Sequence, residues 1–341
     1  MPPEAIDALA ATVGDLRPLL GSDSRALALR RALLEGPLLA LPAKIPGVSE
    51  AVLGPLRDSL VRPVARLSST LHAVDGTTKW AMEFGDGQSA ETVLIPSRTR
   101  GTVCVSSQSG CTRACAFCAT ATLGFRRNLT AGEIVHQYLV ARDAAKKAGL
   151  EASNVVFMGM GEPLDNLDAV LAAVRSLTDV FPGLSPRRVT VSTSGVAPRM
   201  SRFLRESGAS LALSLNASDD ETRTRLMPHN KTWPLASIMG ALRDATAERP
   251  RRFFVEYVQL PGVNDSPADA VRIARLLKGL DVHVNVIPHN PFPGSPFRAP
   301  ERDETLRFHA QVKEQGLKGI IRWPRGRDVA GACGQLALRT A

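Results

Sequence analysis

The feature that most constrains the fold of this chain is a regular alternation of strand and helix patterns that begins near residue 100. Seven apolar segments predict strands: GTVCVSS, NVVFMG, RVTVST, LALSLN, RFFVEYV, VHVNVIP and KGIIRW. Helical patterns such as residues 131–147 and 168–180 lie between them. Strands separated by helices of this length form βαβ units with parallel strands. The sequence therefore predicts an α/β fold built on a parallel sheet or barrel.

Two other patterns precede this alternation. Periodic apolar residues in the first 66 residues, as in SRALALRRALLEG, predict helices. The following stretch alternates in period two, and its Asp75-Gly76 and Asp86-Gly87 pairs predict hairpin turns. We therefore expect a small accessory domain over residues 1–87 and the α/β domain over residues 88–341.

Glycine-rich and polar segments follow several predicted strands directly. They are Gly159-Met160-Gly161-Glu162-Pro163, Ser192-Thr193-Ser194-Gly195, Ser214-Leu215-Asn216 and Pro288-His289-Asn290. In α/β folds the ligand site lies at the carboxyl ends of the parallel strands. These segments therefore predict the position of a ligand site.

Three of the five cysteines lie in the stretch CTRACAFC, after the first predicted strand of the alternation. Cys111, Cys115 and Cys118 supply one thiolate fewer than a closed tetrahedral site needs. Three clustered cysteines in a Gly-flanked loop argue against simple core cysteines. Structural zinc would bring further ligands nearby, but the nearest candidate, His136, lies inside a helical pattern. An iron–sulfur cluster is held by thiolates and would keep one iron open.

The C-x3-C-x2-C spacing, with Phe117 before the last cysteine, resembles the signature of the radical S-adenosylmethionine (SAM) enzymes. The resemblance implies that Cys111, Cys115 and Cys118 hold a 4Fe–4S cluster and that SAM chelates its open iron. Electron transfer, from a donor such as flavodoxin or ferredoxin, would then split SAM to a 5′-deoxyadenosyl radical.

Further segments, in order from about residue 88 to 337, resemble the RlmN/Cfr family of radical SAM RNA adenine methyltransferases. They include AETVLIP, RGTVCVSSQSGC, GFRRNL, GMGEPLDN, RVTVSTSGV, LALSLNA, EYVQLPGVND, NVIPHNPFPGSPF and ACGQLA. The resemblance implies a partial (β/α) radical-SAM barrel preceded by a helical and β-hairpin domain that grips RNA. It also implies methylation of an adenine ring carbon, with C2 favoured, in 23S rRNA or tRNA.

The same resemblance assigns roles to the two remaining cysteines and one glutamate. One SAM would methylate Cys333, and a second would give the radical that takes hydrogen from its S-methyl group. The methylene radical would add to the adenine and leave a covalent protein–RNA adduct. Glu91 would accept the ring proton, and Cys104 would free the product by forming a transient disulfide with Cys333.

The family's SAM-binding positions fall on the strand-end segments. Gly161 would let the backbone approach the methionyl part, and Glu162 would accept from its ammonium group. The other positions are Ser192, Ser214, Leu215, Asn216 and Asn290. The chain departs from the family at Asn216, where histidine is usual, and at His289, where tryptophan is usual. We expect His289 to be either a solvated loop residue or a substrate contact.

The formal net charge of +9 fits either a generally basic proteome or a polyanionic partner. Arginines group before Cys333, after the cysteine loop and before one strand: Arg126, Arg127, Arg187, Arg188, Arg322, Arg325 and Arg327. Grouped around the radical site, they would contact phosphates of RNA. The target adenine would have to be splayed out of its stack to reach a buried radical.

No apolar run approaches the ~20 residues of a membrane span, and the start of the chain lacks a signal-peptide pattern. We expect a cytoplasmic monomer. Three alternatives stay open: methylation of C8 as in the Cfr branch, another RNA target, and an RNA-binding protein with a purely structural cluster. Glu91, Cys104 and Cys333 favour an enzyme, because a binding protein does not need all three.

Overall fold

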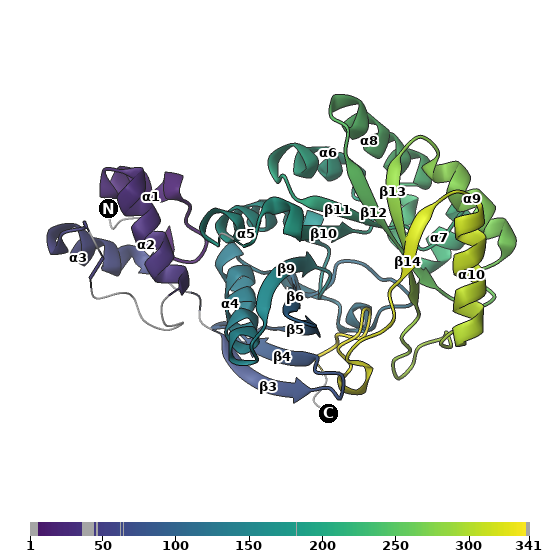
Figure 1. Cartoon of the computed structure of the whole chain (residues 1–341), viewed down its shortest axis with the longest axis horizontal. Coiled ribbons are helices and arrows are strands. Elements are labelled where there is room, and N and C mark those ends of the chain that lie inside the picture. Colours follow the sequence, from purple (N-terminus) through teal and green to yellow (C-terminus); the bar gives the residue numbers. More distant parts are fainter. Residues whose placement is uncertain are drawn as a thin grey trace.

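The structure is a computed structural model that describes residues 6–35, 44–45, 47–61, 63, 65–181 and 183–338. Its centre is a sheet of ten strands in the order β14-β13-β12-β11-β10-β9-β6-β5-β4-β3. The sheet curls around itself, and its edge strands β14 and β3 are not hydrogen-bonded to each other (Figure 1). The fold is therefore an open, partial barrel, as the sequence predicts.

Seven neighbouring strands of this sheet are parallel, and they correspond to the seven predicted strands. They are β6 (Arg100–Cys104), β9 (Glu151–Phe157), β10 (Val189–Thr193), β11 (Ser210–Ser214), β12 (Arg252–Gln259), β13 (Asp281–Pro288) and β14 (Lys318–Ile321). Strands that are buried on both faces have nearly continuous apolar sequences, so they can be predicted from the sequence.

Helices connect the parallel strands and cover the outside of the barrel (Figure 1). The longest is α4 (Ala131–Lys147), which begins at a capping box formed by Thr130 and Glu133. The others are α5 (Leu167–Val180), α6 (Ala197–Glu206), α7 (Asp220–Leu226), α8 (Leu235–Glu248), α9 (Pro267–Leu277) and α10 (Arg302–Glu314).

The two predicted hairpins are confirmed as β3 (Arg66–His72), β4 (Thr78–Glu83) and β5 (Ser89–Ser97). Gly76 and Gly87 occupy the turns with φ of 84° and 78°, which glycine adopts without strain. These antiparallel strands continue the barrel sheet through β6. The expected boundary between residues 87 and 88 therefore falls in the β4–β5 turn, within one sheet.

The helical expectation for the N-terminal region is met by α1 (Val13–Leu20), α2 (Asp23–Glu35) and α3 (Glu50–Ser59), while residues 1–5 and 36–43 lie outside the described residues. The short strands β1 (Ile6–Asp7) and β2 (Leu60–Val61) pair beside them. These elements share a small apolar core and lie beside α4 and α5 (Figure 1).

The contact between this helical group and the barrel includes a buried charge. The Arg30 guanidinium is fully buried and donates to the carbonyl of Ser176 at 3.0 Å and to that of Leu9 at 3.3 Å. Within the described ranges, no helix combines the length and apolar character needed to cross a membrane.

Candidate active site

The cysteine-bearing loop is closed at its base by a small hairpin of β7 (Gln108–Gly110) and β8 (Phe125–Asn128). Gly110 has a φ of 72°, and a Cβ atom there would lie 1.8 Å from the carbonyl oxygen of Gly124. Only glycine fits this crossing point. The hairpin therefore fixes where the loop leaves and rejoins the sheet.

Polar contacts hold the loop against the next strand connection. Gln108 Oε1 accepts from the backbone N–H of Glu162 at 2.9 Å. Arg113 and Thr112 each donate to Asp165 Oδ2 at 2.7 Å. These bonds tie the cysteine loop to the segment that follows β9.

Cys111, Cys115 and Cys118 line one cavity at the carboxyl ends of the parallel strands, which we call the cluster cavity. Burial raises the pKa of Cys111 to about 12 and the pKa of Cys115 well above its usual value, and the Cys118 thiol adds to both shifts. Such thiols need a neighbouring cation to become thiolates, which bound iron would supply. The donor set therefore fits an iron–sulfur cluster.

Within the described part of the chain, no three His, Cys, Asp or Glu side chains are arranged to hold a single metal ion. Zinc–sulfur bonds of 2.3 Å at tetrahedral angles would bring thiolates within about 3.8 Å of one another. The described thiols are not grouped in that way.

The predicted SAM positions lie around the same cavity, with one exception. Its lining includes Gly161, Glu162, Ser192, Ser214, Asn216 and Asn290. Leu215 is fully buried and lines neither this cavity nor the one described below. Its N–H donates to the carbonyl of Glu256 at 3.0 Å, so its role is to join β11 to β12.

Gly161 and Glu162 are fixed by the chain around them. Gly161 has a φ of 101°, and a Cβ atom there would lie 2.6 Å from Gln108. The Glu162 carboxylate accepts from the Ser194 N–H at 2.7 Å, the Ser194 hydroxyl at 2.6 Å and the Leu164 N–H at 3.0 Å. This carboxylate is therefore held in one orientation beside the cavity.

Asn216, one of the departures from the family, has a local structural reason. Its φ is 57°, in the left-handed region that asparagine tolerates better than most residues. Its Oδ1 accepts from the Val258 N–H at 2.9 Å, and its carbonyl accepts from Asn264 at 2.8 Å. Asparagine here braces the end of β11 as well as lining the cavity.

Arg223 braces the same strand ends, and sequence reasoning did not single it out. The side chain is fully buried and donates to the carbonyls of Ser194, Ser214 and Leu215 at 2.5–3.2 Å. Burial lowers its pKa to about 10, so the guanidinium stays charged at neutral pH. It therefore joins the carboxyl ends of β10 and β11 under the cavity.

Among the residues that the structure describes, two buried oxygens of the cluster cavity have no hydrogen-bond partner: Asn290 Oδ1 and Glu256 Oε2. The Asn290 amide nitrogen donates to the Cys333 carbonyl at 3.2 Å, and Glu256 Oε1 accepts from Asn285 at 2.8 Å and from Arg322 at 3.3 Å. An unsatisfied buried acceptor is costly. Both therefore indicate a ligand with N–H or O–H donors, and the amino and hydroxyl groups of SAM fit this requirement.

Glu256 was missed by sequence reasoning, although a signal existed. It is an acidic residue in the middle of the apolar strand pattern RFFVEYV, and it is only 3% exposed. Burial raises its pKa, while Arg322 and Asn285 oppose that shift.

The remaining two cysteines meet in a second space of about 570 Å³, the thiol cavity, which lies between β5, β6 and β9 on one side and β14 on the other. Cys104 is buried at the end of β6, and Cys333 is exposed within the cavity. Burial raises the pKa of Cys104 to about 12. The surrounding protein also raises the pKa of Cys333 to about 12, although that side chain is open to the cavity, and Arg322 opposes both shifts. The two cavities share five lining residues: Met158, Ile287, Asn290, Cys333 and Leu336.

All five cysteines are free, so the expected disulfide between Cys104 and Cys333 is not present in this structure. The segment carrying Cys333 is nevertheless fixed to the cysteine loop. The Gly334 carbonyl accepts from the Ala119 N–H at 2.7 Å, and the Leu336 carbonyl accepts from Thr120 at 2.7 Å. The C-terminal segment therefore closes over the cluster cavity.

The Glu91 side chain does not lie in the thiol cavity with Cys104 and Cys333. It is fully buried on β5 and lines neither cavity. Its Oε1 lies 2.8 Å from Lys79 Nζ, with both side chains 1% exposed, and its Oε2 accepts from the Leu338 N–H at 3.1 Å. The sequence could not show that a lysine on the neighbouring strand pairs with this carboxylate.

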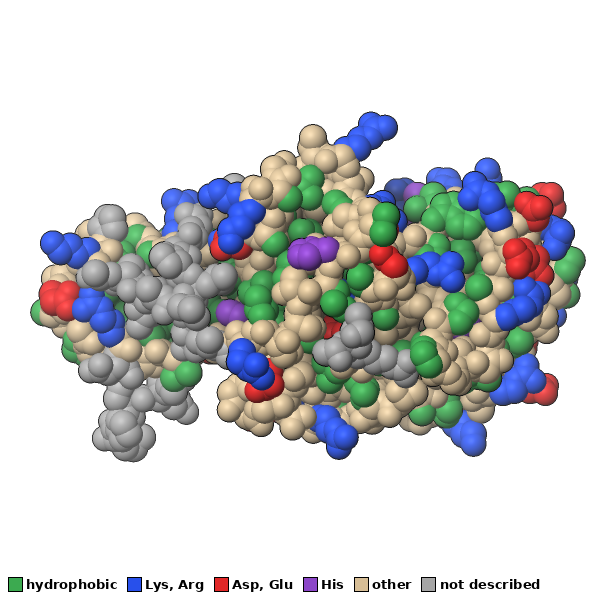
Figure 2. Space-filling view, turned by 90° about the horizontal axis from the view of Figure 1, so that it is seen from below, with side chains coloured by type: hydrophobic (Ala, Val, Ile, Leu, Met, Phe, Trp, Pro, Cys, Tyr) green, Lys and Arg blue, Asp and Glu red, His purple; other side chains and the backbone are tan. Residues whose placement is uncertain are grey.

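The arginines expected around the site are only partly gathered there. Arg127, Arg322 and Arg325 are paired with acidic residues. Arg187 and Arg188 precede β10, at the end of the sheet opposite the cysteine loop. Arg126 and Arg327 are exposed. Figure 2 shows Lys and Arg side chains scattered over one face of the molecule rather than in one block.

His289 is not a solvated loop residue, so that alternative is wrong. It is 2% exposed, lines the cluster cavity, and places Nε2 3.0 Å from the Ser295 hydroxyl. Burial lowers its pKa to about 4. The imidazole is therefore neutral at physiological pH.

Comparison with known proteins agrees with this geometry. Residues 105–277 match the radical SAM superfamily. The dual-specificity RNA methyltransferase RlmN of Alkalilimnicola ehrlichii is 45% identical over 85% of this chain and 81% of its own length. The RlmN of Marinobacter nauticus is 47% identical over 78% of this chain and 73% of its own length.

A solved structure extends the likeness to nearly the whole chain. The crystal structure of a radical SAM methyltransferase from Sphaerobacter thermophilus superposes with a TM-score of 0.87 and 37% identity, covering 98% of this chain and 99% of that one. Sequence, cavity and fold agree, and the chain belongs to the radical SAM superfamily and, within it, to the RlmN family of RNA methyltransferases.

Proposed function

We propose that this protein methylates C2 of an adenine in RNA, with 23S rRNA and tRNA as substrates, through a methyl group carried on Cys333. The observation that carries the proposal is the shared wall of the two cavities. Cys333 lies between the cavity of the three clustered cysteines and the cavity of Cys104. A methyl group on its sulfur would reach both the radical source and the resolving thiol.

Cys111, Cys115 and Cys118 would hold a 4Fe–4S cluster, and SAM would occupy the open iron. When bound, these cofactors supply the electron and the radical that activates the S-methyl group, and two SAM molecules are used per turnover. Gly161, Glu162 and the other lining residues orient SAM: Ser192, Ser214, Asn216 and Asn290. Leu215 directly follows β11 and would contribute through its backbone, which bonds to Glu256 on β12.

The Cys104 thiol is protonated at neutral pH because burial raises its pKa to about 12. Cys104 must therefore lose its proton before it attacks Cys333. Arg322 lines the thiol cavity and favours the thiolate. Glu91 is the proposed acceptor of the adenine proton, and its hydrogen bond from Leu338 links it to the segment that carries Cys333.

The working context follows from the same family membership. We propose that an electron donor such as flavodoxin or ferredoxin reduces the cluster, and that the enzyme works as a cytoplasmic monomer. The helices α1 to α3, with the β3–β4 hairpin, would form the accessory RNA-binding part. The barrel and the C-terminal segment would perform the chemistry.

The test uses two cysteine substitutions that should fail differently. Cys333→Ala removes the methyl carrier, so we expect an intact cluster, no product and no adduct. Cys104→Ala removes only the thiol that frees the product, so we expect protein linked covalently to RNA through Cys333. A denaturing gel of protein from cells, run with and without ribonuclease, measures the adduct.

The control is the double variant Cys104→Ala/Cys333→Ala, which should show no RNA-dependent shift. Normal turnover by Cys104→Ala, or the absence of methyl-Cys333 in protein from cells, would contradict the mechanism. Mass mapping of RNA from cells lacking the gene then identifies the modified carbon and nucleotide.

A further inference from the structure

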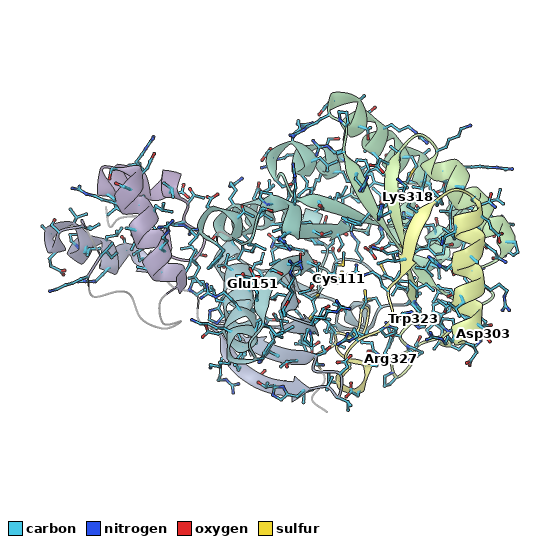
Figure 3. All side chains as sticks on the ribbon, in the orientation of Figure 1. Cys111, Glu151, Asp303, Lys318, Trp323 and Arg327 are labelled. Carbon is cyan, nitrogen blue, oxygen red and sulfur yellow. The ribbon has the colours of Figure 1, made fainter. Side chains whose placement is uncertain are left out.

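An exposed tryptophan stands at the mouth of the thiol cavity. Trp323 follows β14 and lines this cavity with an exposed fraction of 40%, whereas Cys104 in the same cavity is 8% exposed. Figure 3 shows Trp323 just above Arg327 of the C-terminal segment and to the left of Asp303 at the start of α10. The tryptophan therefore lies at the rim, and Cys104 lies at the floor.

The indole packs against an arginine, and the backbone just before it is anchored to the neighbouring strand. The Arg302 guanidinium carbon lies 4.7 Å from the centre of the indole ring, within cation–π distance. In the backbone before Trp323, the Arg322 N–H donates to the Val286 carbonyl at 2.9 Å, and Pro324 directly follows the tryptophan. A fixed aromatic surface loses little conformational entropy when something packs against it.

The neighbours of Trp323 also suit a nucleic acid. Ile320 at the same rim is 58% exposed, and Arg322 and Arg325 line the cavity beside it. Both arginines are held by carboxylates, from Glu256 and Asp75. The exposed Arg302 against the indole adds positive charge beside this flat apolar surface, and that combination binds unstacked bases and their phosphates.

We propose that Trp323, backed by Arg302, is a stacking platform for the unpaired nucleobase next to the target adenine. The inference rests on the proposed function, which brings a splayed adenine to the thiols at the cavity floor. A base at the floor leaves its neighbour in the chain at the rim, where Trp323 stands. Because every base has a π-face, this contact supplies affinity without reading sequence.

The test compares Trp323→Ala with Trp323→Phe in RNA binding and in methyl transfer. The probe is protein-free 23S rRNA from cells lacking the gene, at one fixed salt concentration. Loss of one base–aromatic stack is worth ~1–3 kcal/mol, so we expect the Kd and KM of Trp323→Ala to rise about 5- to 150-fold. Trp323→Phe should keep most of the affinity.

The matched control is Leu306→Ala. Leu306 is 43% exposed on α10, one turn after Arg302, and lines neither cavity. The Kd and KM of the Leu306→Ala variant should stay at the wild-type values. Thermal midpoints of all three variants check that the fold is retained.

The outcomes separate this inference from the proposed function. A Trp323→Ala protein with wild-type Kd and KM overturns the stacking platform, even if methyl transfer proceeds. Equal losses in Trp323→Ala and Trp323→Phe also overturn it, because stacking tolerates phenylalanine. A Kd that depends on an aromatic at position 323, in a protein that methylates no adenine, supports the platform and overturns the proposed function alone.

Discussion

At the scale of single residues, the pairing of Glu91 with Lys79 complicates any test of Glu91 as a proton acceptor. The two charges are 1% exposed and 2.8 Å apart. Removing one partner of a buried pair leaves an uncompensated charge, which is strongly destabilising. Loss of activity in a Glu91 variant could then arise from unfolding alone.

We therefore predict the effect of Glu91→Gln on stability first. The substitution leaves the Lys79 ammonium buried beside a neutral amide, and we expect the free energy of unfolding to fall by about 3–5 kcal/mol. Chemical denaturation followed by circular dichroism measures it. An unchanged free energy of unfolding would show that the pair is not buried in solution.

The double variant Lys79→Met/Glu91→Leu separates stability from chemistry. Replacing both charges with apolar side chains of similar size is often neutral or stabilising. We expect the stability to return and methyl transfer to stay absent, because the proton acceptor is gone. Methyl transfer at the wild-type rate would assign the proton to another group.

At the scale of elements, the β7–β8 hairpin was not predicted, although the cysteine loop that it closes was. Its two strands are only three and four residues long, too short for a periodic pattern. Most of the parallel strands were predictable because they are longer apolar runs between helices; β14 has only four residues and was predicted from its place in the alternation. The closure depends instead on one close approach, between Gly110 and the carbonyl of Gly124.

This closure makes Gly110→Ala a test of the cluster site. The added methyl group would lie 1.8 Å from a backbone oxygen, so the hairpin must open. We expect the wild type to hold about four irons after anaerobic reconstitution, and Gly110→Ala to lose most of them. Iron analysis and the visible absorption of the brown protein measure the loss.

Gly240→Ala is the matched control. Gly240 lies on α8, away from the cysteine loop, and a Cβ atom there has open space. We expect unchanged or slightly raised stability and full iron content, because alanine favours a helix more than glycine does. A Gly110→Ala protein with as much iron as Gly240→Ala would show that the hairpin does not hold the cysteine loop.

At the scale of the whole molecule, the sequence predicted the order of strands and helices but not which distant residues bond to each other. Arg325 pairs with Asp75, and the Glu91 carboxylate accepts from the backbone N–H of Leu338. Such pairs join residues that are far apart along the chain, so no local sequence pattern predicts them. The same limit applies to the arginines expected to gather for RNA, several of which are used within the protein.

The net charge of +9 gives a prediction that does not depend on any one arginine. RNA binding should weaken steeply with salt because bound phosphates release counterions, and we expect a log–log slope steeper than about −3. Fluorescence anisotropy with labelled RNA over a salt series measures the slope. An RNA affinity that does not change with salt concentration would contradict binding through phosphate contacts.

Two substitutions refine this measurement. Arg126 is exposed, so Arg126→Gln should reduce the slope by about 0.7–0.9 if it contacts a phosphate. Arg127 pairs with Asp86 and Glu133, so Arg127→Gln should lower the thermal midpoint and leave the slope nearly unchanged. A reduced slope for Arg127→Gln together with an unchanged slope for Arg126→Gln would instead assign the phosphate contact to Arg127.

The contact between the C-terminal segment and the cysteine loop also bears on when the cluster is inserted during synthesis of the chain. A chain emerging from the ribosome exposes Cys111 to Cys118 while Cys333 has not yet been translated. Gly334 and Leu336 later bond to Ala119 and Thr120 and cover the end of that loop. Cluster delivery to a nascent chain would therefore meet an open loop, whereas delivery to a folded chain would meet a loop already bonded to Gly334 and Leu336.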